Sequence, residues 1–266
     1  MKSTDTGEHV LRYVAIGDSL TEGVGDLDWP DGTPRGWADR LARRLADHHG
    51  AVDYANFAVR GYRSVEVLER QVRPALELEP DLLTLTVGMN DILRPELDMD
   101  LLRRRLVEIV TPFTAKGVDV AVVPIPDIRG VTPAGRFLHR RRLELNELYR
   151  YLSREHGMIP PTETTCTVFE DRRAWAEDRL HLSELGHIRL SVAAAELFGV
   201  PAEDEWAALP PGPPPRRTLG TQITWLYRYV WPWTYRRLRG RSTGDGRTAK
   251  YPQLVRLTAH EQTQEV

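Results

Sequence analysis

The chain has 266 residues, of which 28% are charged and 41% hydrophobic, and this length suits one substantial α/β domain with a further segment. Such a composition is typical of a soluble globular protein and excludes a largely disordered chain. The net charge of −2 excludes a general electrostatic attraction to nucleic acid. Cys166 is the only cysteine, so a disulfide within the chain is excluded and a reducing compartment is expected.

The N-terminal segment gives no indication of export. Residues 1–9 are polar, and the short apolar run that follows contains Arg12, so we expect no secretory signal. No stretch of the sequence reaches the roughly 18 apolar residues that a membrane-spanning helix needs. These observations predict a cytoplasmic location.

Short apolar runs alternate with longer segments of helical periodicity up to about Val200. The runs that predict strands are 11–16, 52–57, 81–87 and 118–123. The segments that predict helices are 37–45, 65–76, 101–110, 137–156 and 183–197, with Pro74 expected to bend or end the second of them. Strands that alternate with helices predict a mostly parallel sheet covered on both faces, which is a three-layer α/β/α sandwich.

The composition changes after Leu209. Residues 210–215 read PPGPPP, which predicts a stiff, non-helical linker. We therefore expect a domain over residues 1–209, a Pro-rich linker over 210–218 and an aromatic, basic tail over 219–266.

The tail differs from the domain in charge and in periodicity. Between Pro211 and Lys250 nine Arg and Lys residues face one acidic residue. Ile223, Leu226, Tyr227 and Val230 fall on one face of a predicted helix, which Pro232 is expected to break into two pieces.

Two partners for this tail agree with its composition. Aromatic residues beside arginines are typical of a segment that makes peripheral contact with an anionic membrane surface. Alternatively, the tail folds back over the acidic domain or causes self-association with a second copy. We favour the second interpretation, because exposed aromatic area is usually buried.

Polar residues follow the predicted strands at the points where ligands bind in an open α/β sheet. The first strand ends in Gly17-Asp18-Ser19-Leu20, and the loop after the second strand reaches Gly61. The third strand is followed by Gly88, Asn90 and Asp91, and the pair Asp178 and His181 precedes the last helix of the domain.

These residue types are the ones that acyl transfer requires. A serine hydroxyl such as that of Ser19 becomes a nucleophile when a histidine, here His181, takes its proton. Asp178, three residues earlier, is placed to orient the imidazole. The main-chain N–H groups of Ser19 and Gly61, with the side chain of Asn90, are candidates to stabilise the oxyanion.

The sequence resembles the SGNH/GDSL hydrolase superfamily over roughly residues 11–198. The four matching blocks are G-D-S-L (17–20), N-F-A-V-R-G (56–61), G-M-N-D (88–91) and D-R-L-H (178–181), in the order of that family.

The resemblance implies a flavodoxin-like sheet and an ester hydrolase of the esterase, lipase or lysophospholipase type that forms an acyl-enzyme. Its implied residues are Ser19 as nucleophile, His181 as base and Asp178 as orienting acid, with Ser19, Gly61 and Asn90 in the oxyanion hole. The expected partner is a small-molecule ester; neither a cofactor, a metal nor a nucleic acid is expected. The resemblance does not extend to the tail after Leu209.

Two alternatives belong to other functional classes. A metal-dependent phosphoesterase also places Gly-Asp and Gly-Asn turns at strand ends, but it needs several histidine ligands, and Met89 stands where a ligand would be expected. A non-catalytic binding protein on the same fold would lack Ser19, Asp178 or His181, all of which are present. Sensitivity to a chelator would distinguish the metal enzyme from the serine hydrolase.

Three loops are expected to surround the pocket, namely 24–35, 94–98 and 126–135. From these loops, Trp29 and Ile128 are candidates to line an acyl cavity, and ordinary packing residues are an equal alternative. Arg35 and Arg129 are candidates to meet an acidic alcohol part of the substrate, although ordinary solvated arginines are the simpler interpretation.

Overall fold

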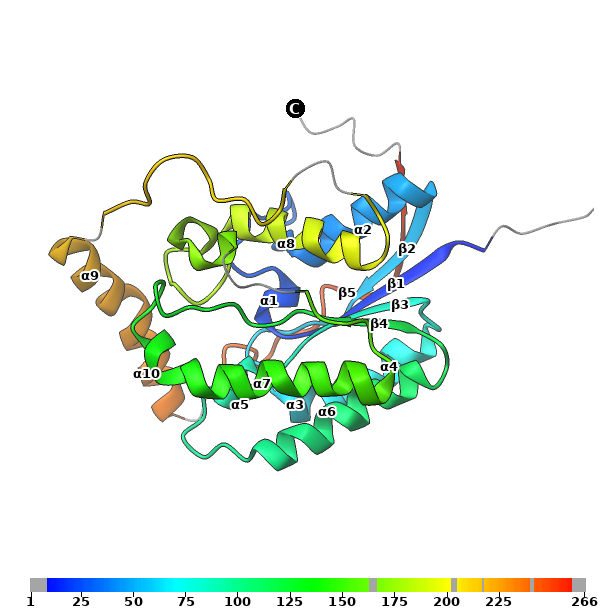
Figure 1. The fold of residues 1–266 in the computed structure, drawn as a ribbon, viewed down its shortest axis with the longest axis horizontal. Coiled ribbons are helices and arrows are strands. Elements are labelled where there is room, and N and C mark those ends of the chain that lie inside the picture. The colour runs from blue at the N-terminus through cyan, green and yellow to red at the C-terminus, as the bar shows by residue number, and fades with distance from the viewer. Residues whose placement is uncertain (1–8, 163–166, 202–204, 217, 240–241, 260–266) are drawn as a thin grey trace, which may run out of the picture.

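The structure, a computed structural model, describes residues 9–162, 167–201, 205–216, 218–239 and 242–259. Cys166 and the first eight residues, on which two of the expectations above depend, lie outside the described residues. Figure 1 shows a central sheet with helices on both of its faces. This arrangement confirms the predicted α/β/α sandwich.

The sheet has five strands in the order β4-β3-β1-β2-β5. They are β1 (Leu11–Gly17), β2 (Ala51–Asn56), β3 (Leu82–Thr86), β4 (Asp119–Val122) and β5 (Tyr251–Thr258). The first four are parallel, in the β2-β1-β3-β4 order of a flavodoxin-like sheet. The fifth strand comes from the predicted tail and runs antiparallel to β2, so the sheet is mixed.

The helices of the domain form the two outer layers (Figure 1). Helices α2 (Gly36–His49) and α8 (Glu184–Leu197) cover one face. The other face carries α3 (Ser64–Arg70), α4 (Val72–Glu77), α6 (Met99–Thr114) and α7 (Ala134–His156). The short helices α1 (Ser19–Glu22) and α5 (Met89–Ile92) begin just after β1 and β3, and two 3-10 turns span Val168–Glu170 and Arg172–Ala174.

Each face of the sheet has its own hydrophobic core, because side chains alternate along a strand. Along β1, Tyr13 belongs to the core under α2 and α8, whereas Val14 belongs to the core under α6 and α7. Trp37, Leu41 and Leu45, which the helical spacing predicted to share a face of α2, are all fully buried.

The predicted helix over residues 65–76 is two helices in the structure. The break falls at Gln71, whose side chain bonds to the backbone of Gly17 instead of facing solvent. Pro74 does not end a helix, because it lies in the first turn of α4, where its missing N–H costs no hydrogen bond.

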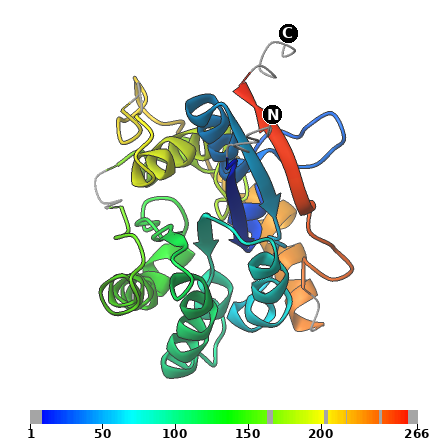
Figure 2. The ribbon, with the colours of Figure 1, turned by 90° about the vertical axis from the view of Figure 1, so that its right-hand side faces the viewer.

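Residues 242–258 form what we call the C-terminal strap, a loop followed by β5. In Figure 2 this red strand lies along β2 at the edge of the sheet. Arg256 on β5 pairs with Asp53 on β2. The strand was not predicted, because its sequence has no clear alternation of apolar and polar residues, and it covers an edge that would otherwise be open.

Residues 218–239 form what we call the arm, a helical segment outside the sandwich (Figure 1). It runs through α9 (Leu219–Trp225), a π-helical turn (Leu226–Val230) and α10 (Trp231–Leu238). The expected break at Pro232 is absent. The Trp231 N–H bonds to the Leu226 carbonyl five residues back, and this wider turn accommodates the proline ring that follows. No helix in the described part of the chain is long and apolar enough to span a bilayer.

Candidate active site

Ser19 is the first residue of α1, just beyond the carboxyl end of β1. The preceding Gly17 has a φ of +143°, and a Cβ atom there would lie 2.3 Å from the main-chain oxygen of Thr86 on β3. Gln71 holds the turn: its side chain accepts the Gly17 N–H at 2.7 Å and donates to the Gly17 carbonyl at 2.9 Å. The backbone that carries Ser19 is therefore fixed from two sides.

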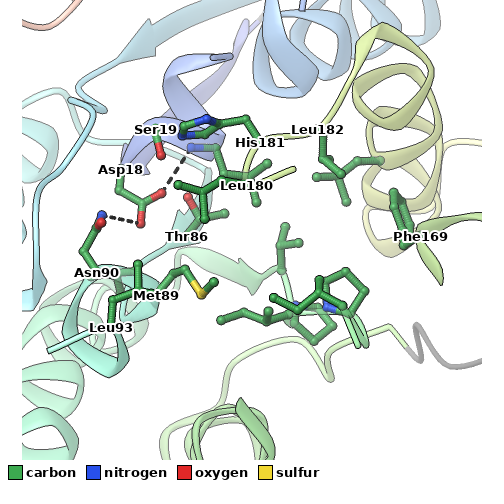
Figure 3. A pocket seen from close by; sticks show the side chains of 18 of the residues that line it. Asp18, Ser19, Thr86, Met89, Asn90, Leu93, Phe169, Leu180, His181 and Leu182 are labelled. Carbon is green, nitrogen blue, oxygen red and sulfur yellow. Dashed lines mark hydrogen bonds between the residues drawn. The ribbon is translucent and has the colours of Figure 1, made fainter. Parts of the chain in front are cut away.

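Asp18 and Asn90 connect the ends of β1 and β3. The buried Asp18 carboxylate accepts the Leu20 N–H at 3.2 Å and a hydrogen bond from Asn90 Nδ2, also at 3.2 Å (Figure 3). Asn90 Nδ2 also donates to the Tyr62 carbonyl at 2.9 Å. Burial raises the pKa of Asp18 to about 7, against the opposing effects of the Leu20 N–H and the charge of His181.

Gly61 lies in the loop after β2 with a φ of +81°. The loop is held on both sides of this glycine. Before it, Arg60 donates to the Glu22 carboxylate of α1 through its main-chain N–H at 2.5 Å and its Nε at 2.8 Å. After it, the Ser64 N–H and hydroxyl donate to the Asp91 carboxylate at 2.9 and 2.6 Å.

Two main-chain N–H groups at these strand ends, those of Ser19 and Gly61, donate to no acceptor within the described residues. Both residues line the same pocket as Asn90. Three potential donors thus come from three strand ends, and two of them have a free hydrogen. Such a preorganised set is what a developing oxyanion requires.

His181 and Asp178 form a closely hydrogen-bonded pair. His181 Nδ1 lies 2.6 Å from Asp178 Oδ2, and Asp178 Oδ1 accepts the N–H groups of Leu180 and His181, both at 3.0 Å. Burial alone would raise the pKa of Asp178, but the hydrogen bond and charge of His181, together with these N–H groups, lower it. The carboxylate is therefore charged and fixes the imidazole in place.

The His181 ring and the Ser19 side chain face the same pocket, and Figure 3 shows the ring directed toward the serine. The hydrogen bonds of the described residues include none from the Ser19 hydroxyl to the imidazole. In enzymes without substrate such a bond is often loose and tightens only when substrate binds.

The pocket is a largely apolar cavity of about 120 Å³. The apolar residues around it are Leu20, Val87, Met89, Leu93, Val123, Pro124, Ile125, Pro126, Ile128, Phe169, Trp175, Leu180, Leu182 and Leu190. The polar groups described above lie at one side of it (Figure 3). The cavity can therefore hold an acyl chain whose carbonyl lies at Ser19.

The residues expected from the surrounding loops divide into two groups. Ile128 lines the pocket, but Trp29 does not. Trp29 instead stacks under the guanidinium groups of Arg35 and Arg43 at 4.5 and 4.6 Å. Arg35 is therefore also away from the pocket, and Arg129 pairs with Asp127 within its own loop.

The C-terminal strap contributes to the site, which the sequence analysis missed. Thr243 lines the pocket, and a Cβ atom on Gly61 would lie only 2.4 Å from Ser242 Oγ and 2.8 Å from Thr243 Oγ1. A glycine at position 61 therefore permits the strap to pass against this loop. The run Ser242-Thr243-Gly244 is the only signal in the sequence, and it cannot be distinguished from an ordinary surface loop.

His187, on α8, has a structural position. Its Nδ1 accepts the Trp37 N–H at 3.1 Å and its Nε2 donates to the Val24 carbonyl at 3.2 Å. The ring is fully buried, and this burial lowers the pKa of His187 to about 4. The residue therefore links α8 to α2 as a neutral imidazole.

Within the described residues, no group of three or more His, Cys, Asp or Glu side chains is arranged to hold a metal ion.

Solved structures with similar folds include several hydrolases. TesA superposes with a TM-score of 0.58 at 22% identity, covering 70% of this chain and 97% of its own. A catalytic mutant of Axe2, an acetylxylan esterase from Geobacillus stearothermophilus, gives 0.60 at 18% identity, covering 74% and 96%. The psychrotrophic esterase EstA from Pseudoalteromonas sp., inhibited by monoethylphosphonate, gives 0.57 at 16% identity, covering 71% and 96%. At these identities the likeness shows the fold.

Sequence comparison identifies a relative that matches part of the chain, and a family whose profile matches most of it. The uncharacterized protein YpmR of Bacillus subtilis (strain 168) is 36% identical over 117 residues, and the match spans 41% of this chain and 41% of the length of that relative. The profile of the GDSL-like Lipase/Acylhydrolase family matches residues 15–189, a region that contains every strand end described above. The chain therefore belongs to the GDSL-like lipase/acylhydrolase family.

Proposed function

We propose that the protein hydrolyses carboxylic esters through an acyl-enzyme on Ser19. The observation that carries this proposal is the Asp178–His181 pair, with 2.6 Å between Oδ2 and Nδ1, at the same pocket as Ser19. Because Nδ1 is occupied by the carboxylate, Nε2 is the nitrogen that is available to the serine hydroxyl.

In the first half of the reaction the Ser19 oxygen attacks the ester carbonyl carbon while its proton passes to His181 Nε2. The tetrahedral intermediate then breaks its bond to the alcohol oxygen, which takes the proton from Nε2 as it leaves. In the second half a water molecule attacks the acyl-Ser19 carbonyl and gives a proton to Nε2. Collapse of this intermediate returns the proton to Ser19 and releases the carboxylic acid.

The oxyanion in both halves would be stabilised by the free N–H groups of Ser19 and Gly61. Asn90 would be the third donor. Both hydrogens of its amide are engaged in the present structure, by the Tyr62 carbonyl and by Asp18. Its weaker contact is the 3.2 Å bond to Asp18, so we expect the oxyanion to take this hydrogen.

The apolar pocket supports an uncharged acyl chain as the part of the substrate that lies beyond Ser19. The apolar lining favours an acyl chain of short or medium length, in an esterase or lysophospholipase type of reaction. Two structural neighbours, Axe2 and EstA, are named as esterases, which supports ester chemistry on this fold.

The test is hydrolysis of p-nitrophenyl esters of increasing acyl length by the wild type and by Ser19→Ala. Loss of the nucleophile should lower kcat by about 10⁴-fold or more and leave the melting temperature unchanged. Ser153→Ala, on α7, is the matched control and should retain full activity. An ethylphosphonate ester should label the wild type at Ser19, as seen by mass spectrometry, and should not label Ser19→Ala.

Two results would contradict the proposal. One is an unchanged kcat/KM in Ser19→Ala. The other is an activity that EDTA abolishes and a divalent metal restores, which would favour the metal-dependent phosphoesterase instead.

A further inference from the structure

The arm, residues 218–239, carries an apolar stripe that turns away from the rest of the protein. The stripe consists of Leu219, Ile223, Leu226, Tyr227, Trp231 and Tyr235, whose side chains are between 46% and 83% exposed. They recur at helical spacing and therefore lie along one side of the arm. Elsewhere in the described residues, the large exposed hydrophobic side chains form no such run: Leu27, Leu209 and Val255 lie in separate segments, and Phe137 and Leu143 are six positions apart on α7.

The opposite side of the arm is fixed to the loop that carries Asp178. Trp225 Nε1 donates to the main-chain carbonyl of Asp178 at 3.0 Å. Arg179 donates to the Gln222 side chain at 2.7 Å, and its guanidinium lies 4.4 Å from the centroid of the Trp225 ring. The Tyr229 hydroxyl donates to Glu177 at 2.8 Å. Because these polar contacts hold one side of the arm against the loop, the apolar stripe on the other side faces solvent.

The charge of the arm restricts what could cover the stripe. Residues 216–241 contain seven arginines and no acidic residue, whereas the whole chain has a net charge of −2, so the remainder of the protein is acidic. An exposed amphipathic helix that combines aromatic residues and arginines fits an anionic lipid interface, where the apolar side enters the acyl boundary and arginines meet the headgroups.

A second copy of the chain fits this surface less well. In a symmetric dimer the same patch contacts itself, so the arginines of one arm would meet the arginines of the other. Like charges brought together in this way oppose association. The arm of one copy also offers no acidic residue to a neighbouring arm.

We propose that the arm binds the protein to the surface of an anionic lipid bilayer, with the apolar stripe in the interface. The bound arm would contact, through Trp225, the loop that carries Asp178, the proposed catalytic acid. The protein would then hold its pocket close to esters that reside in the membrane. This inference goes beyond the proposed ester hydrolysis. Lipid binding by the arm does not require that the protein hydrolyses esters.

The experiment measures sedimentation of the full chain with vesicles of phosphatidylcholine, with and without phosphatidylglycerol. We expect binding to the anionic vesicles that weakens as salt is added, and at least about tenfold weaker binding to the zwitterionic ones. The triple variant Ile223→Ser, Tyr227→Ser, Trp231→Ser should lower the affinity by more than about tenfold. The matched control, Leu143→Ser with Leu209→Ser, removes exposed leucines outside the arm and should bind as the wild type does.

Two further measurements separate binding from folding and from catalysis. Ser19→Ala should bind vesicles as the wild type does. Brominated lipids should quench tryptophan fluorescence of the unaltered protein, and Trp231→Phe should remove much of this quenching. The proposal is overturned if the wild type ignores anionic vesicles, or if the triple variant binds them equally well. It is also overturned if light scattering shows a dimer that only the triple variant disrupts, since the stripe would then be an interface between copies.

Discussion

Lys250, sixteen residues before the end of the chain, forms a buried ion pair with Asp39 of α2, with 2.9 Å between Nζ and Oδ1. The same ammonium group donates to the main-chain carbonyls of Glu22, Pro34 and Arg35 at 2.9, 2.7 and 3.0 Å. The C-terminal strap is thus fixed to the helix layer at the point where it enters β5. Since Thr243 of the same strap lines the pocket, this ion pair also contributes to the shape of the site.

Replacement of this lysine should therefore destabilise the whole protein. Lys250→Met leaves the buried Asp39 carboxylate without its cation and should lower the free energy of unfolding by about 3–5 kcal/mol. The double variant Asp39→Asn with Lys250→Met should recover part of this loss, because no unpaired charge remains. Urea denaturation measures both values. Lys116→Met, at an exposed turn, is the control and should change little.

An equal stability of the wild type and Lys250→Met would show that the strap is not tied to the domain by this pair.

The proposed catalytic acid can be tested without removing its backbone contacts. In Asp178→Asn the new amide oxygen can still accept the N–H groups of Leu180 and His181. Its NH₂ group, however, would face His181 Nδ1 and favour the tautomer that protonates Nε2. We expect kcat to fall by about 10⁴-fold with the fold intact, since the Trp225 bond uses the main-chain carbonyl.

The kinetics of p-nitrophenyl ester hydrolysis and a thermal melt check this expectation. Glu177→Gln, which alters the neighbouring exposed acid, is the matched control and should keep kcat near the wild-type value. A small loss of kcat in Asp178→Asn, similar to that of the control, would exclude the assigned role of Asp178.

The order of strands and helices along the domain could be predicted, because the first four strands are apolar runs and the segments between them have helical periodicity. The meeting of three site blocks, 17–20, 56–61 and 88–91, could be predicted for the same reason, since they follow strands whose ends meet at one edge. The fourth block, 178–181, follows no strand and lies just before α8. The strap could not be predicted, because β5 contains Pro252, Gln253 and Arg256 and is held by pairing with β2 and by the partial burial of Tyr251, Leu254 and Leu257. In this pairing β5, close to the C-terminus, contacts β2, which comes from the N-terminal part of the sequence.

Two local features were decided by contacts that sequence spacing does not indicate. Trp29 was a candidate for the pocket or for ordinary packing, and the second alternative holds: its ring stacks with arginines and its Nε1 donates to Asp39 at 3.0 Å. Pro232 was expected to break the arm, but a π-helical turn accommodates it. In each case a tertiary contact or a local backbone adjustment outweighs the pattern.

His187 should make the protein sensitive to acid. Burial lowers its pKa from 6.5 to about 4, so between these two values the unfolded chain binds a proton that the folded protein does not. Stability therefore rises with pH across this window, and it is lost as the pH falls from 6.5 toward 4, by on the order of 3 kcal/mol. His187→Gln should show a smaller fall in stability between pH 7 and pH 5, measured by urea denaturation. Exposed His48→Gln should behave as the wild type does; an unaltered fall in His187→Gln would exclude His187 as the cause.

Asp18 should have the opposite effect on stability. Burial raises the pKa of this carboxyl group from 3.8 to about 7, so the folded protein keeps a proton that the unfolded chain releases between these values. Ionising Asp18 in the folded state therefore costs free energy, and this cost grows as the pH rises and is complete above about pH 7. Asp18→Asn removes the charge, while its amide oxygen can still accept the Leu20 N–H.

The stability of Asp18→Asn relative to the wild type should accordingly increase from pH 4 to pH 8, by at most about 4 kcal/mol. Urea denaturation at several pH values gives this difference directly, and comparison with the wild type cancels the titration of every other group that the substitution leaves undisturbed. Asp100→Asn, which changes an exposed acid at the start of α6, is the control for the loss of one surface carboxylate. If the difference for Asp18→Asn did not vary with pH, Asp18 would be ionised throughout this range in the folded protein. Asn90 would then face a permanent negative charge, and the oxyanion would have to compete with that charge for the Asn90 amide.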